Sequence, residues 1–186
     1  MRGWLARERP VEEESPDPNR RAATQLLNAS MSYARLILRK YGELAPFGFA
    51  MDREGQIARE TLELPKLPRD PARMWKLLAE HIQDRARRGL IQAWAMGANV
   101  TLPRPSAEGY TDAVVLNIER DNGYALEVTV PYRIYGGQLK NVMPRRIALG
   151  KMEAEETVSR IFTAGVPKEA PAGSSPIHEP DTGSGA

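Results

Sequence analysis

Few side chains in this sequence have the type and spacing that catalysis or metal binding requires. It contains no cysteine, which excludes a disulfide framework, a thiolate metal site and a cysteine nucleophile. Its two histidines, His81 and His178, lie far apart in the chain, so a two-histidine metal site is not expected. A Walker-type loop, a dinucleotide-binding glycine pattern and a serine elbow are all missing. The sequence therefore favours a non-catalytic protein, and it predicts no catalytic residue, cofactor or metal ligand.

Three polar residues on expected strands are candidates for a ligand site. Asn99, Asn117 and Glu127 would wall a shallow depression over the small side chains of the strand at 91–102. An amide there would hold the Glu127 carboxylate for binding or proton transfer, with Arg133 nearby. The alternatives are a solvated outer sheet face and ordinary helix packing over small side chains.

A second candidate is the segment Tyr132 to Tyr135, which two glycines follow. Tyr132, Arg133 and Tyr135 are residue types that protein interfaces favour. We expect this segment to be a binding loop, although such residues are also common near turns that bind nothing.

Basic residues form two clusters although the net charge is only +2. Residues 24–150 carry 18 Lys and Arg against 13 Asp and Glu, whereas residues 151–186 carry 3 against 6. The basic patch consists of Arg85, Arg87, Arg88, Lys140, Arg145 and Arg146. It would bind phosphates weakly, or it would only complement helix dipoles.

The elements that must position these residues centre on a hairpin. Two apolar runs, 114–118 and 124–130, flank Asp121-Asn122-Gly123. A three-residue loop that ends in a left-handed glycine pairs Ile118 with Leu126, which makes one face of the hairpin aliphatic. Asn117 and Glu127 then lie opposite each other on the other face.

Helical spacing of apolar residues predicts two helices. The first runs over 21–41 and stops at Gly42, and the second begins at the N-cap Asp70 with Pro71 in its first turn and ends at Gly89. Further strands are expected at 46–52, 56–64, 91–102 and 142–149, and a short helix is expected at 153–162.

Together these elements predict an α+β domain with an antiparallel sheet of about five strands in the order α-β-β-α-β-β-β. We expect the two main helices to pack on one face of the sheet, and a short strand and helix to follow at the C-terminal end. The domain would span 21–163, between a flexible N-terminal extension at 1–20 that contains Trp4 and a disordered acidic tail at 164–186. The element order resembles that of roadblock-type and profilin-type modules, and this likeness of order alone implies a domain that binds other proteins.

The function expected from these features is a protein-interaction module of a bacterial cytosol, such as an adaptor, an immunity-type protein or an assembly protein. Its partner would be another protein or a second copy of the chain. One alternative is a small-molecule or nucleotide-binding protein, with or without an enzymatic activity, that uses the face around Asn117 and Glu127. Another is a nucleic-acid binder that uses the basic patch. No apolar run is long enough to span a membrane, and the composition is typical of a cytoplasmic protein.

Overall fold

A computed structural model describes residues 17–64, 68–137 and 144–162. The expected tail at 164–186, Trp4 and most of the expected extension at 1–20 lie outside these residues. In chain order the described part forms α1 (Pro18–Tyr41), β1 (Phe47–Asp52), β2 (Ile57–Glu60), α2 (Pro71–Arg87), β3 (Ile91–Thr101), β4 (Asp112–Arg120), β5 (Ala125–Tyr135), β6 (Arg146–Leu149) and β7 (Glu153–Glu156). The α+β class and the order of the elements through β5 agree with the prediction.

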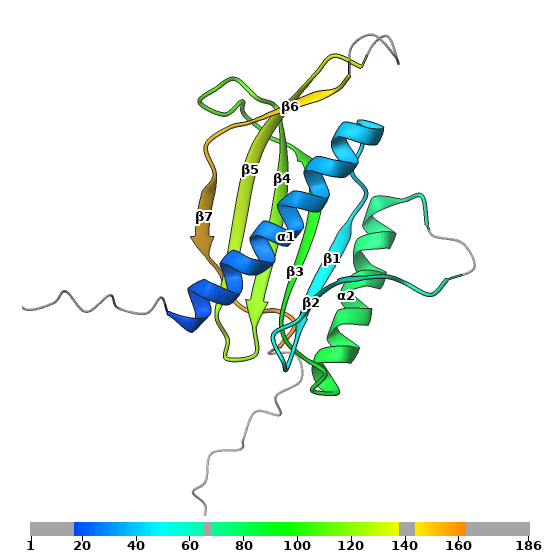
Figure 1. Ribbon diagram of the computed structural model, residues 1–186, viewed down its shortest axis with the longest axis vertical. Helices are drawn as coiled ribbons and strands as arrows, with labels where there is room; N and C mark the ends of the chain where they lie inside the picture. Colours follow the sequence, from blue (N-terminus) through cyan, green and yellow to red (C-terminus); the bar gives the residue numbers. More distant parts are fainter. Residues whose placement is uncertain (1–16, 65–67, 138–143, 163–186) are drawn as a thin grey trace, which may run out of the picture.

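The strands form one antiparallel sheet in the order β2-β1-β3-β4-β5-β6, and β7 also pairs with β5 (Figure 1). β6 pairs with residues 132–135 of β5, and β7 pairs with residues 126–129 of the same strand. The sheet therefore has seven strands, more than the five expected, because β5 is long enough to pair with two short strands along one edge.

The short helix expected at 153–162 was a wrong prediction, because Glu153–Glu156 is strand β7. All four residues of β7 are exposed, so no alternation of buried side chains marks it in the sequence. The apolar residues that suggested a helix lie after the strand, where Ile161 and Phe162 pack into the core.

The central hairpin has the predicted register. Ile118 pairs with Leu126 and Asn117 pairs with Glu127, and the backbone N–H of Arg120 donates to the carbonyl of Tyr124 across the loop. Gly123 has a φ of 88°, the left-handed conformation that the three-residue loop requires.

The two helices cover opposite faces of the sheet, not one face as predicted (Figure 1). Alternate residues of β3 show the reason: Ala93 and Ala95 belong to the core under α1, and Trp94 and Met96 belong to the core under α2. A strand that is apolar on both faces is buried on both faces. Helix α1 packs mainly on β1, β3, β4 and β6, whereas α2 packs mainly on β1 and β3, so α2 covers a smaller part of its face.

Gly97 marks the closest packing beneath α1. A Cβ atom at this position would lie 2.5 Å from a methyl carbon of Leu116 and 2.5 Å from the ring of Phe47. Both neighbours are buried, so neither can move aside into solvent. The glycine therefore lets two large side chains meet over the strand.

Both helices have the boundary residues that the sequence indicated, except that α1 begins three residues earlier than expected. Asp17 is its N-cap, and Pro18 occupies the first turn. Asp70 caps α2 by accepting from the amides of Ala72 and Arg73. Gly42 ends α1 with a φ of 79°. Neither described helix is long and apolar enough to cross a membrane.

Candidate functional site

The three polar residues expected to wall one depression lie on opposite faces of the sheet. Asn99 pairs with Val114, so it lies on the α1 face, whereas Asn117 and Glu127 pair with each other on the α2 face. The expected common depression is therefore wrong. The small side chains of β3 on the α1 face lie beside the aliphatic face of the hairpin, which together with α1 fills the space over them.

Tyr132, expected in a binding loop, is instead a core residue. Its hydroxyl donates to Oδ1 of Asn99 at 2.7 Å, and the residue is buried. Burial and the nearby charge of Asp112 raise the pKa of the Tyr132 phenol to about 12. This pair joins two of the predicted site residues, and it has a structural role at the end of the α1 face.

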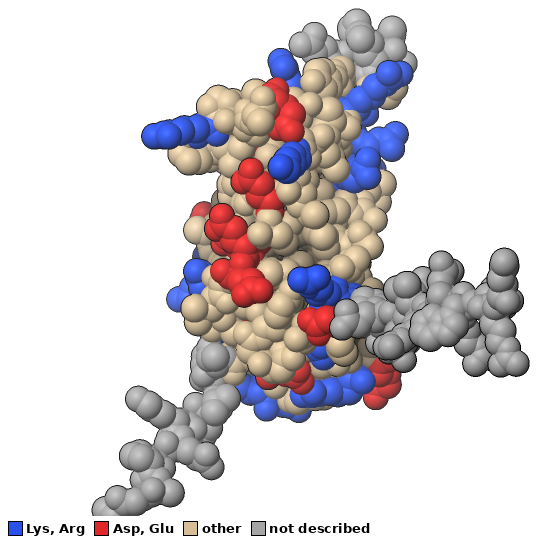
Figure 2. Space-filling model, turned by 90° about the vertical axis from the view of Figure 1, so that its left-hand side faces the viewer, with Lys and Arg blue, Asp and Glu red and all other residues tan. Residues whose placement is uncertain are grey.

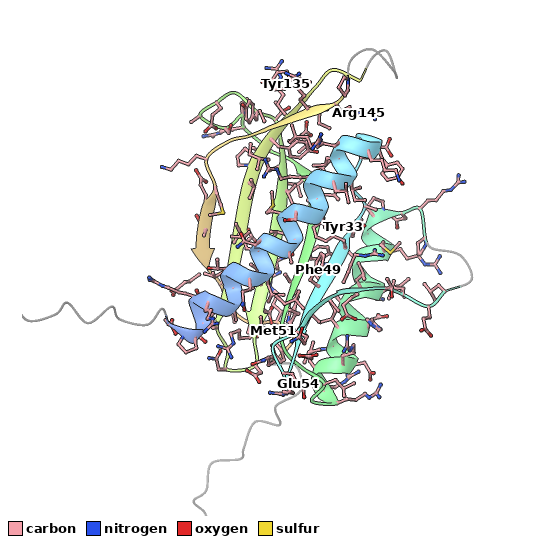
Figure 3. All side chains as sticks on the ribbon, in the orientation of Figure 1. Tyr33, Phe49, Met51, Glu54, Tyr135 and Arg145 are labelled. Atoms are coloured by element: carbon pink, nitrogen blue, oxygen red, sulfur yellow. The ribbon has the colours of Figure 1, made fainter. Side chains whose placement is uncertain are left out.

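Arg133 and Tyr135 are exposed on the other side of β5. The Arg133 guanidinium lies 5.3 Å from the centre of the Tyr135 ring, as in a cation–π contact. Strand β6 covers this edge of β5, so the backbone there is already paired. Figure 3 shows Tyr135 and Arg145 at the upper end of the molecule, close to where β6 approaches the C-terminal end of α1.

The first predicted basic cluster makes ion pairs within the protein. Arg85 donates to the carboxylate of Glu60, and Arg87 and Arg88 lie 3.8 and 3.5 Å from the carboxylate of Asp84. The two pairs with Asp84 are exposed and lie in the last turns of α2. Their main effect is thus on the helix end and not on a ligand.

Glu60 is the more unusual member of this group because its carboxylate is buried. One oxygen accepts from Arg85, and the other lies 2.8 Å from Nε2 of His81. Both partners come from α2, so the cluster joins the edge strand β2 to the helix. His81 thus serves as a partner of this buried carboxylate.

The second predicted basic cluster is divided in its roles. Nη1 of Arg145 donates to the carbonyl of Lys40 at 3.1 Å and so satisfies an acceptor at the end of α1. Lys140 lies outside the described residues. Arg146 lines a groove between α1 and β6.

This groove, which we name the arginine groove, has a volume of about 510 Å³ and is lined by Ser32, Arg35, Leu36, Arg39, Arg146 and Ile147. Among the described residues, no carboxylate lies within ion-pair distance of its three arginines. Leu36 is 62% exposed between them. The groove therefore offers three unpaired guanidinium groups around an apolar side chain.

Arg35 and Arg39 were missed as site residues in the sequence, although a signal was present. Between Pro18 and Tyr41 the helix carries five basic residues and no acidic one. Arg35 and Arg39 lie one turn apart outside its apolar stripe, and such a pair repels unless an anion lies nearby. Arg146 lies opposite them because β6 pairs with β5 and so passes beside α1. The residue pattern of the helix gives no information on that pairing.

Acidic side chains follow the edge of the sheet formed by β7. Figure 2 views this edge, where acidic side chains run down the middle of the surface and basic ones lie at both its upper and its lower end. Glu127, Glu153, Glu155 and Glu156 are the exposed carboxylates of β5 and β7.

Glu119 is a second buried carboxylate, and it fixes the chain that follows β7. It accepts from the hydroxyl of Ser159 at 2.7 Å and from the backbone N–H groups of Arg160 and Ile161 at 2.8 and 3.0 Å. These bonds hold residues 159–161 against the α2 face of β4.

Metal-ligating side chains do not converge in the described ranges, where no group of three His, Asp or Glu residues could hold an ion. Comparison of the chain with family models, with curated proteins and with solved structures finds no match.

Proposed function

We propose that this chain is a non-catalytic protein-interaction module of the bacterial cytosol that binds an acidic segment of a partner in the arginine groove. One observation carries the proposal: Arg35, Arg39 and Arg146 converge from two elements, with no described carboxylate paired to any of them. The cysteine-free and arginine-rich composition supports the compartment.

The chemistry of the groove defines the segment that it would bind. A guanidinium group binds a carboxylate through two parallel hydrogen bonds, and arginine is enriched at the centre of protein interfaces. Leu36 and Ile147 add apolar surface between the charges. The expected ligand is therefore a peptide segment in which two or more carboxylates flank an apolar residue.

The helix end alone does not account for these arginines. Arg145 and the backbone N–H of Gly42 already satisfy carbonyl groups at the end of α1. The helix dipole acts within the last turn, so it favours Arg39 but not Arg35 or Arg146. A cluster of unpaired like charges raises the free energy of the folded state, and a bound anion would remove that cost.

The proposal is tested by selecting from a display library of random peptides on the full chain at physiological salt. The enriched peptides should carry at least two Asp or Glu residues around an apolar one. Fluorescence anisotropy of a labelled selected peptide then measures affinity. In the triple variant Arg35→Gln/Arg39→Gln/Arg146→Gln, affinity should fall at least about 100-fold, since each of the three charge-assisted contacts contributes about 1 kcal/mol or more.

A matched control keeps the number of removed charges constant. Arg73 and Arg87 of α2 and its C-cap residue Arg88 are exposed, and replacement of these three arginines by Gln should leave peptide affinity within about twofold. Selection of peptides without acidic residues, or equal losses in both triple variants, would overturn the proposal. It would also be overturned if a single-stranded oligonucleotide bound more tightly than the peptide with a steep dependence on salt, which marks a nucleic-acid site.

A further inference from the structure

A second groove, which we name the β7 groove, lies beside the N-terminal half of α1. Helix α1 and strand β7 form its walls, and β5 forms its floor. Its volume is about 430 Å³, and the residues that line it include Leu27, Leu126, Val128, Met152, Ala154 and Glu156. The arginine groove is lined by the C-terminal half of the same helix, so the two grooves are separate.

The β7 groove is open because α1 crosses the sheet diagonally and packs mainly on other strands (Figure 1). Val128 pairs with Ala154 in the register of β5 with β7, so alternate residues of the two strands face the α1 side together. Met152 lies two residues before Ala154, and it is 48% exposed. The groove therefore has an apolar wall at Met152 and Ala154 that α1 leaves in contact with solvent.

The chain enters the described residues at this groove. Asp17, the first described residue, lines it, and the sixteen residues before Asp17 contain one aromatic residue, Trp4, followed by Leu5. Leu5 lies twelve residues before Asp17, a stretch that spans roughly 40 Å when extended. The groove follows α1 from Asp17 to Leu27, which is about 15 Å of helix. Trp4 and Leu5 can therefore reach every part of the groove.

The charges of the groove and of this segment are complementary. Residues 1–9 carry three arginines against one glutamate, and the arginines lie on both sides of Trp4-Leu5. Strand β7 carries three glutamates, of which Glu156 lines the groove, and no described cation lies within ion-pair distance of them. Arg20 also lines the groove, but Asp17 on the same wall carries the opposite charge. Figure 2 shows the acidic side chains along this edge of the sheet.

We propose that the N-terminal segment of this chain folds back along α1 and places Trp4 and Leu5 in the β7 groove, with Arg7 and Arg9 beside the glutamates of β7. The thioether of Met152 makes favourable contacts with an aromatic ring and adapts to its shape. A short covalent linker gives the segment an effective concentration of about millimolar, so contacts too weak to hold a separate peptide suffice. This docking does not depend on the proposed binding of acidic peptides.

The indole N–H of Trp4 is the probe, and that of the buried Trp94 is the reference in the same molecule. The Trp4 signal is assigned by its loss in Trp4→Phe, and its ¹H–¹⁵N NOE reports motion on the nanosecond scale. In the full chain the Trp4 value should equal that of Trp94, and the Trp4 ring should show NOEs to the methyl group of Met152. A synthetic peptide of residues 1–11 gives the value of the undocked segment.

Ala154→Arg tests the groove side, because the new side chain fills the groove and repels the arginines of the segment. In this variant the Trp4 value should fall to that of the peptide, and the NOEs to Met152 should disappear. Val158→Arg is the matched control: Val158 is 76% exposed and lines a pocket on the α2 side, so the same charge added there should change neither observation.

The proposal is overturned if Trp4 in the full chain has the value of the free peptide, or if Ala154→Arg and Val158→Arg behave alike. Should Ala154→Arg fail to fold, Trp4→Ala/Leu5→Ala replaces it: this variant should shift the methyl signals of Met152 and Leu126 and leave those of Leu36 unchanged, and the absence of these shifts overturns the proposal. NOEs that arise only between labelled and unlabelled copies, and that are lost on dilution, would assign the groove to a second molecule and would also overturn it.

Discussion

Replacing Glu119 by Gln should release the chain segment that follows β7. In the parent chain, one carboxylate oxygen accepts from Ser159 and Ile161, and the other accepts from Arg160. A glutamine side chain has a single acceptor oxygen, and its NH₂ group would face one of the two backbone donors. At least one of these backbone N–H groups therefore loses its acceptor, whichever way the amide is oriented, and the larger cost arises where it is the buried N–H of Ile161.

The size of the effect follows from these bonds. An unsatisfied buried N–H costs about 1–3 kcal/mol, and the remaining bonds weaken because they are no longer assisted by charge. A neutral amide is less costly to bury than a carboxylate, which offsets part of this loss. A net change of about 2 kcal/mol corresponds to opening of residues 159–161 that is about 30-fold more frequent.

Hydrogen exchange of the native protein, followed by NMR, measures this opening at individual amides. Exchange at the amides of Arg160 and Ile161 should accelerate by about 30-fold in Glu119→Gln, while the central strands keep their protection. Glu127→Gln is the matched control, because this carboxylate is exposed on the same sheet face of the neighbouring strand. Unchanged exchange in Glu119→Gln, or equal acceleration in both variants, would refute the reasoning.

Three further predictions concern the stability of the fold, measured by denaturant unfolding. Gly97→Ala should cost about 1–3 kcal/mol because its Cβ would overlap two buried side chains, whereas Gly48→Ala, whose nearest contact would be 3.1 Å, should cost less. Arg85→Met should destabilise the protein by about 3 kcal/mol because Glu60 loses a charged partner, and adding Glu60→Gln should restore part of this loss. The Tyr132 pKa of about 12 lies above the ordinary value near 10, so the stability that its neutral phenol contributes is complete below about pH 10 and is lost as the pH rises toward 12. Tyr132→Phe should therefore lose less stability than the parent chain between pH 10 and 11.5.

Features that depend on local sequence could be predicted before the structure was known. The hairpin register followed from the parity of apolar residues around Gly123, and the start of α2 followed from Asp70 and Pro71. Each is fixed by residues that are close in the chain, so the physical cause lies within the segment itself.

Features that depend on which elements meet could not be predicted in the same way. The apolar residues on both faces of β3 do not reveal that a different helix covers each face. The four residues of β7 are all exposed, so no pattern in the sequence distinguishes this strand from a loop. The arginine groove could not be predicted because Arg146 reaches Arg35 and Arg39 only through the position of β6 in the folded sheet. The location of Asn99 and Asn117 on opposite faces of the sheet follows from the register of β3 with β4, so it could be predicted only by someone who knew that register.

The position of β7 has a consequence for how molecules of this protein meet at high concentration. Its outer side carries unpaired backbone groups, which in many proteins allow sheets of different molecules to join into fibres. Three of its four residues are glutamates, so two copies that approached along this border would bring carboxylates of the same sign together. The border thus resists polymerisation by mutual repulsion, and a rise in salt concentration weakens that barrier.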